Sequence, residues 1–233
     1  SEMCIRDSTC NEIRLLAEAL ALDADETRIA ELIALLHDVG RFSQFAQYRT
    51  YNDLRSIDHG RRGVEVLREE GLLEALRPDE RQWVETAAGL HSRKSLPSTL
   101  KGRALLFTRL VRDADKIDIF RVVIGFYERG RQAAGANDDS PQLEAELPDD
   151  PQYQPEVLEA VRNQQTVDWA SLRTLTDAKL CQLGWVYDLN FTPSLRRIDE
   201  CGFLTKLIGF LPPDDAIQEL CKKILDDVAA RLA

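Results

Sequence analysis

The segment Leu35-Leu36-His37-Asp38-Val39-Gly40-Arg41 decides the fold of this chain. Apolar residues lead into it from Ile29 and Ile33 at helical spacing, and His37 continues their stripe. The histidine-aspartate pair therefore closes an amphipathic helix, with His37 on the side that faces the core. Gly40 is expected to stop this helix.

Helical periodicity also extends to both sides of this segment. Further stripes cover residues 13–20, 59–67, 78–91 and a long stretch from Pro97 to about Arg129. Residues 41–55 read as a connector with one short turn. Because no strand-like alternation, repeat or heptad array occurs, the fold class is predicted as all-α, a single-domain helical bundle.

The composition is that of a globular protein. The chain has 233 residues, 44% of them hydrophobic and 30% charged, and its five cysteines form no CxxC pair. Neither a disulfide framework nor a structural zinc site is indicated. No apolar run approaches the length of about 18 residues that suggests a membrane span, and no signal peptide is recognised, so a cytoplasmic location is expected.

Four segments are expected along the chain. Residues 1–8 join abruptly to the helical pattern and resemble a translated sequencing adapter, so they are treated as non-native. Residues 9–130 would form a metal-binding helical core. Residues 131–155 would form an acidic loop containing Gly and Pro. Residues 156–233 would then supply helices that pack on the same domain.

Charge limits the choice of partner. The net charge of −10 argues against a nucleic acid polymer or an anionic membrane as the partner. Residues 91–121 nevertheless hold eight Lys or Arg against three Asp. A locally basic region favours a small anionic substrate over a polymer, although ordinary solvated helix faces would produce the same pattern. The sequence leaves a homo-oligomer open.

The chain has only three histidines, and each lies at a helix face or end: His37, His59 and His91. Asp115 follows on the apolar stripe of the next helix, where a lone carboxylate would be costly. A single histidine of this kind is more often a core residue, but the set together indicates divalent metal ions. Imidazole and carboxylate ligands suit Mn, Fe, Co, Ni or Zn, and we favour Mn or Fe.

The order of these residues resembles the HD-domain metal-dependent phosphohydrolase superfamily. Residues 35–41 resemble its namesake motif and residues 113–118 its closing aspartate, over a region of roughly residues 9–127. The resemblance implies a helical bundle that holds one or two divalent ions. Members with additional histidines between the two motifs are commonly dinuclear.

By this resemblance, the core metal ligands are His37, Asp38 and Asp115, with Asp38 placed to bridge two ions. His59 and His91 would then serve the second ion. The family's first ligand is a histidine on the order of thirty residues upstream of the pair, near Ile5, where this chain has none. Either the adapter-like segment replaced it, or the chain is a natural variant with an incomplete site.

Metal-activated water would attack phosphorus, and cations would stabilise the charge on the phosphoryl oxygens. Arg41 and Lys94 are the catalytic candidates, Lys94 because it shares a face with His91 if that helix continues. Helix-end cations are the alternative explanation of both. The aromatic side chains of Phe45, Tyr48 and Tyr51 could stack a base or could simply pack.

Two further aspartates have weaker assignments. Asp113 lies about 200 degrees round the helix from Asp115, so it is expected to face elsewhere and to pair with a base such as Lys116. Asp58 could orient His59 or could cap the helix that His59 begins.

The sequence therefore predicts a metal-dependent phosphohydrolase that acts on a small phosphorylated molecule, with a nucleotide as the leading candidate. One alternative is a degenerate HD module that binds a ligand or partner without turnover, which the absent first histidine motivates. Another is a di-iron oxygenase, because iron held by histidine and carboxylate ligands also activates oxygen.

Overall fold

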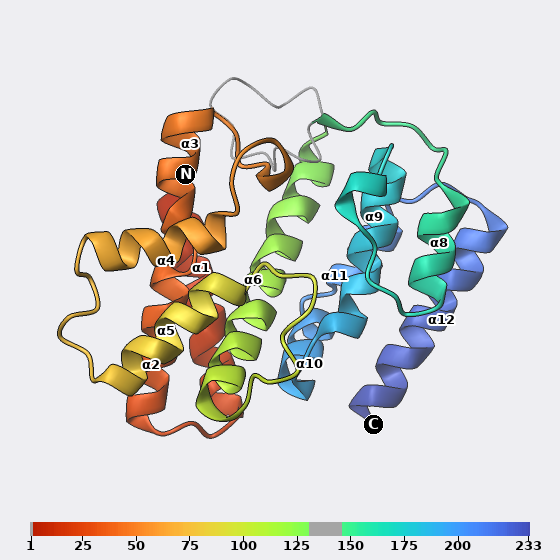
Figure 1. Cartoon of the computed structure of the whole chain (residues 1–233). Helices are drawn as coiled ribbons and strands as arrows, with labels where there is room; N and C mark the ends of the chain where they lie inside the picture. The colour runs from red at the N-terminus through yellow and green to blue at the C-terminus, as the bar shows by residue number, and fades with distance from the viewer. Residues whose placement is uncertain (1, 131–145) are drawn as a thin grey trace. The chain divides into compact units, whose positions relative to one another are not determined.

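The computed structural model describes residues 2–130 and 146–233, and side chains from residue 8 onward. Every regular element in these ranges is a helix, which confirms the all-α prediction (Figure 1). The chain divides into two compact units, residues 1–118 and 119–233. The first unit contains α1 (Glu2–Ala19), α2 (Ala24–Leu36), α3 (Gly40–Tyr48), η1 (Asp53–Arg55), α4 (His59–Glu69), α5 (Pro78–Leu90) and the first part of α6 (Gly102–Arg129).

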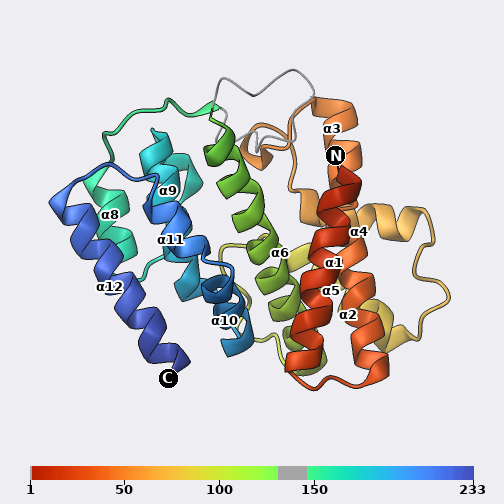
Figure 2. The same ribbon diagram turned by 180° about the vertical axis from the view of Figure 1, so that it is seen from behind.

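Helices α1 and α2 form an antiparallel pair, which both ribbon views show side by side (Figures 1 and 2). A capping box starts α2: the backbone N–H of Glu26 donates to Asp23, and the backbone N–H of Asp23 donates to the Glu26 carboxylate. Their facing stripes are fully buried, among them Ile13, Leu16 and Ile33. This packing holds the C-terminal end of α2 in place, directly before the histidine-aspartate pair.

The prediction that Gly40 stops a helix was wrong. Helix α2 already ends at Leu36, and Gly40 begins α3, which covers much of the predicted connector. A Cβ atom at Gly40 would lie 2.1 Å from the carbonyl oxygen of His59 and 2.5 Å from the backbone nitrogen of Gly63. Glycine is required here because α3 begins directly against α4, and this packing outweighs the low helix propensity of glycine.

Helices α5 and α6 complete the first unit. Pro78 occupies the first turn of α5, and the buried residues Val84, Ala87 and Ala88 form its inner face. Helix α6 begins at Gly102, five residues later than the predicted start at Pro97. Gly102 has a positive φ of 61°, a backbone conformation that glycine adopts without strain.

The second unit is built from the rest of α6 and a further set of helices: α8 (Pro155–Arg162), η3 (Trp169–Ser171), α9 (Leu175–Gly184), η4 (Trp185–Asp188), α10 (Thr192–Glu200), α11 (Phe203–Ile208) and α12 (Asp215–Leu232). That residues 156–233 pack on the same domain as the metal-binding core stays a prediction. Most of the predicted 131–155 loop lies outside the described residues. Within the described residues, no helix has the length and apolar character needed to cross a membrane.

Candidate metal centre

Five side chains from four places in the first unit converge. His37 and Asp38 directly follow α2, His59 is the first residue of α4, His91 directly follows α5, and Asp115 lies within α6. All three histidines are buried, whereas the side chains of Asp38 and Asp115 are 27% and 24% exposed. Solvent therefore reaches the centre at its carboxylates, while the imidazoles form its inner wall.

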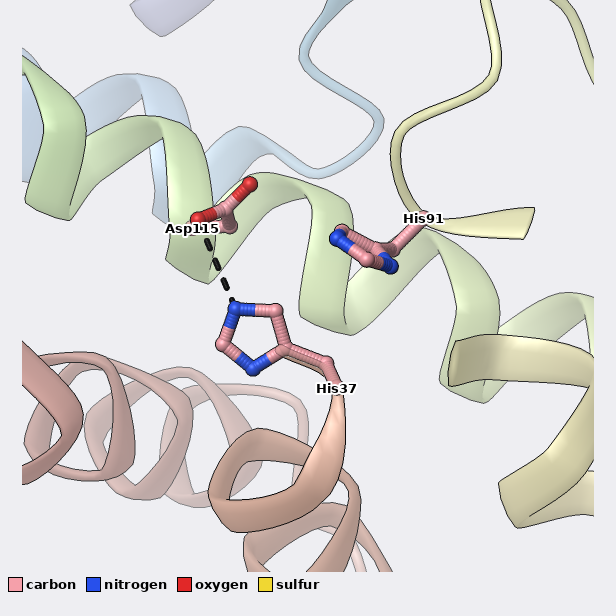
Figure 3. A group of neighbouring side chains, drawn as sticks. All are labelled: His37, His91 and Asp115. Carbon is pink, nitrogen blue, oxygen red and sulfur yellow. Dashed lines mark ion pairs between the residues drawn. The ribbon is translucent and has the colours of Figure 1, made fainter. Parts of the chain in front are cut away.

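These residues form two overlapping groups of the size that a metal ion needs. One consists of His37, His91 and Asp115, and the other of Asp38, His59 and His91, with the ligand atoms of each within 4.8 Å of one another. In the first group the imidazole of His37 points toward Asp115, with 3.6 Å between Nε2 and Oδ1 (Figure 3). The structure thus brings together all five residues that the sequence predicts as ligands.

Asp38 presents one carboxylate oxygen to each group. Its Oδ2 lies 3.7 Å from Nε2 of His37, and its Oδ1 lies 3.3 Å from Nε2 of His59 and 3.4 Å from Nε2 of His91. A carboxylate with its two oxygens turned in this way has the geometry for bridging two ions.

The outer nitrogen of each histidine has a hydrogen-bond acceptor. Nδ1 of His37 donates to the carbonyl of Ala34 over 2.7 Å, and Nδ1 of His91 donates to the carbonyl of Ala88 over 2.8 Å. Nδ1 of His59 lies 2.7 Å from an oxygen of Asp53. A carbonyl or carboxylate can only accept, so Nδ1 carries the proton and Nε2 of a neutral ring keeps its lone pair.

The Nε2 atoms of the histidines face one another and Asp38, and this arrangement favours a positive charge between them. Nε2 of His59 and Nε2 of His91 are only 3.0 Å apart and both face Oδ1 of Asp38. Two lone pairs and a carboxylate oxygen repel one another unless a cation or a proton lies between them. Three imidazole nitrogens and two carboxylates are also the donor set that first-row divalent ions prefer, so the residues present fit such ions.

Electrostatics in the metal-free site follow the same pattern. Burial acts to lower the pKa of His37, but Asp38 and Asp115 outweigh it and raise that pKa to about 9. Burial acts to raise the pKa values of both carboxyls, but neighbouring positive groups hold the pKa of Asp38 well below its usual range and lower that of Asp115. Burial lowers the pKa of His91. A protonated His37 therefore offsets part of the negative charge of the two carboxylates.

Metal binding is expected to displace the proton of His37. Because this pKa is about 9, the ring is protonated at neutral pH, and Nε2 can bind an ion only after losing its proton. We expect release of close to one proton from His37 and an affinity that rises about tenfold per pH unit up to pH 9. Calorimetric titration with Mn²⁺ in buffers of different ionisation enthalpy measures both. An affinity that does not change between neutral pH and pH 9 would contradict this assignment.

Arg41 lies against the centre, and its catalytic role stays a prediction. Its Nε lies 3.2 Å from each oxygen of Asp38, and its Nη1 donates to the carbonyl of Tyr51 and to Oε1 of Gln44. These bonds use Nε and Nη1 and leave Nη2 for a further acceptor. Lys94 is different: α5 ends at Leu90, so Lys94 lies beyond the helix and is exposed. Because the helix does not continue to Lys94, this residue does not share a helix face with His91.

Sequence reasoning missed the carboxylate that contacts His59. The partner of this imidazole is Asp53 on η1, whereas Asp58 caps α4 by accepting from the backbone N–H of Arg61. Burial acts to raise the pKa of Asp53, but the hydrogen bonds from His59 and Gln44 and the positive charge nearby together lower it below the usual value. Gln44 was also missed, and its amide nitrogen lies 2.8 Å from Oδ1 of Asp53. The sign of this contact in the sequence is an acidic residue a few positions before His59.

The remaining candidates have other positions. Asp113 is outside both groups and is completely buried, and its pairing with a base such as Lys116 stays a prediction. Phe45 and Tyr51 stack on each other with centroids 4.9 Å apart, so these rings pack as a pair, and Tyr48 is exposed. The position near Ile5, where the family's first histidine was expected, lies outside the residues whose side chains are described.

Comparison with known proteins identifies a domain in the first part of the chain. The family model of the HD domain matches residues 12–119, a range that includes all five converging residues. No curated protein and no solved structure matches the chain significantly. The matched segment contains both the helices of the first unit and the histidine-aspartate cluster. Residues 12–119 therefore form an HD domain, and HD domains are generally metal-dependent hydrolases.

Proposed function

We propose that this protein is a metal-dependent phosphohydrolase that cleaves a phosphoester or phosphoanhydride bond of a small phosphorylated molecule. The observation that supports this most strongly is the position of Asp38, whose two oxygens face the two groups of imidazoles. Divalent ions held there would supply Lewis acidity and would lower the pKa of a coordinated water from 15.7 toward ~7.

The surroundings of the centre favour a small anionic substrate. The histidines are buried and the carboxylates are partly exposed, so a substrate reaches the centre from the side of Asp38 and Asp115. The guanidinium of Arg41 lies on Asp38, and its Nη2 can donate to a phosphoryl oxygen. Arg41 would hold the phosphoryl group and stabilise the negative charge that develops on it.

Phosphate release from a panel of nucleotides tests this function. With Mn²⁺ we expect hydrolysis of at least one class of nucleotide, loss of activity with a chelator, and recovery when Mn²⁺ is added back. Absence of turnover in a protein that binds the metal stoichiometrically would contradict the proposal and would favour the ligand-binding module. Iron-dependent oxygen uptake without phosphate release would favour the oxygenase.

Arg41 and Lys94 provide a matched pair of variants. Arg41→Ala is expected to lower kcat/KM by about 10²–10³-fold, because a positioned donor to the developing charge is lost. Lys94→Ala is expected to stay near the wild-type value, because the exposed Lys94 side chain follows the end of α5. The kcat/KM values of both variants, measured on the best substrate of the panel, decide the point. Equal losses would remove Arg41 from its assigned role.

A further inference from the structure

A hydrogen-bonded chain connects the buried Gln44, the partly exposed Asp53 and the buried His59 behind the metal centre. Gln44 is completely buried, and its amide nitrogen lies 2.8 Å from Oδ1 of Asp53, 2.8 Å from Oγ of Ser56 and 3.1 Å from the carbonyl of Ile57. The other oxygen of Asp53 lies 2.7 Å from Nδ1 of His59. The chain therefore ends on the imidazole whose Nε2 faces Asp38.

We propose that Asp53, held by Gln44, is the positioning residue that fixes the ring of His59 and sets the affinity of the ion on the Asp38, His59 and His91 side. This inference rests on the metal centre of the proposed function. A carboxylate that accepts from Nδ1 fixes the proton there, orients Nε2 and increases its basicity as a ligand.

Asp53 also accepts from the backbone N–H of His59 over 3.3 Å, but other residues supply the side-chain caps of η1 and α4. The turn of η1 is capped by Asn52, whose side chain accepts from the backbone N–H of Leu54. Helix α4 is capped by Asp58, which accepts from the backbone N–H of Arg61. With both element starts capped by neighbours, the short bond of Asp53 acts on the ring of His59.

His59 also differs from the other two histidines in its partner. His37 and His91 donate from Nδ1 to backbone carbonyls of their own preceding helices, α2 and α5. Only His59 among the three has a carboxylate as the partner of Nδ1, and it begins its helix rather than following one. Loss of Asp53 should therefore lower the affinity for the ion near His59 and leave the affinity for the ion near His37 and Asp115 unchanged.

Titration of the metal-free protein with Mn²⁺ and with Co²⁺ tests this selectivity. Removal of such an outer partner typically costs 10–100-fold in metal affinity, so we expect about tenfold for Asp53→Asn and about 100-fold for Asp53→Ala. The affinity of the ion near His37 and Asp115 should remain unchanged. Asp58→Asn is the matched control, because Asp58 is next to His59 in sequence but bonds to the backbone of α4 and to Arg93. Its affinity for both ions should stay at the wild-type value.

The nitrogen resonances of His59 in the metal-free protein give an independent measurement. The wild type should show the proton on Nδ1, and Asp53→Ala should show a shift of population toward Nε2–H. Folded Asp53 variants that keep both wild-type ion affinities and the Nδ1 proton would overturn the inference. If the alanine variant does not fold, the isosteric Asp53→Asn decides. If the wild type binds no ion, the proposed function fails, while the resonances still show whether Asp53 orients His59.

Discussion

Replacing Asp38 with alanine is expected to remove metal-dependent hydrolysis, with a loss in kcat of more than ~10³-fold. Among the residues that the structure describes, only Asp38 has oxygens that lie against the nitrogens of all three histidines, at 3.3 to 3.7 Å. Its loss affects both groups at once. Metal content by elemental analysis and phosphate release on the same preparation give the result.

Two further variants make the Asp38 experiment specific. Asp115→Ala removes a carboxylate from one group only, so this variant should retain the ion that Asp38, His59 and His91 hold. Asp58→Ala removes the acidic side chain that caps α4 and is next to His59 in sequence. This variant should still bind both ions. An Asp38→Ala protein that keeps its metal content and more than a small fraction of its activity would exclude Asp38 as a bridge.

The second large effect is expected from Gly40→Ala. The added Cβ would lie 2.1 Å from the carbonyl oxygen of His59 and 2.5 Å from the backbone nitrogen of Gly63, and neither backbone atom can move away freely. We expect the free energy of unfolding to fall by ~3 kcal/mol and the melting temperature by about 10 °C. Metal affinity should also fall, because the backbone of His59 would have to shift.

Gly63→Ala is the control for this prediction, since Gly63 lies at the same helix crossing. Its Cβ would have its nearest neighbour, the backbone nitrogen of Gly40, at 3.5 Å, which is ordinary contact. An alanine within α4 should be neutral or stabilising by up to about 1 kcal/mol, since glycine is unfavourable inside a helix. Thermal melting followed by circular dichroism compares the two variants. Equal destabilisation by both would show that the close approach at Gly40 is not what limits the packing.

The five converging residues could be predicted from the sequence because each has a local signal. His37 and His91 continue apolar helical stripes, Asp115 lies on another stripe, and Asp38 and His59 belong to recognisable short motifs. Such patterns show which side chains face the core. They do not show which side chains meet there, and the distances around Asp38 come from the structure alone.

Asp53 and Gln44 could not be predicted, because they lie in a segment that reads as an irregular connector. Their roles depend on α3 beginning at Gly40 and passing directly against α4, a tertiary contact that overrides the helix-breaking tendency of glycine. The error on Lys94 is of the same kind: the periodicity of α5 does not show that the helix ends at Leu90.

We propose that His37, Asp38, His59, His91 and Asp115 hold divalent ions. Anomalous diffraction at the manganese edge, from crystals grown with Mn²⁺, locates such ions. We expect two peaks, one in contact with Asp38 and His59 and the other in contact with His37 and Asp115, with His91 completing one of the two sites. Crystals that contain Mn²⁺ but show no peak among these five side chains would contradict it.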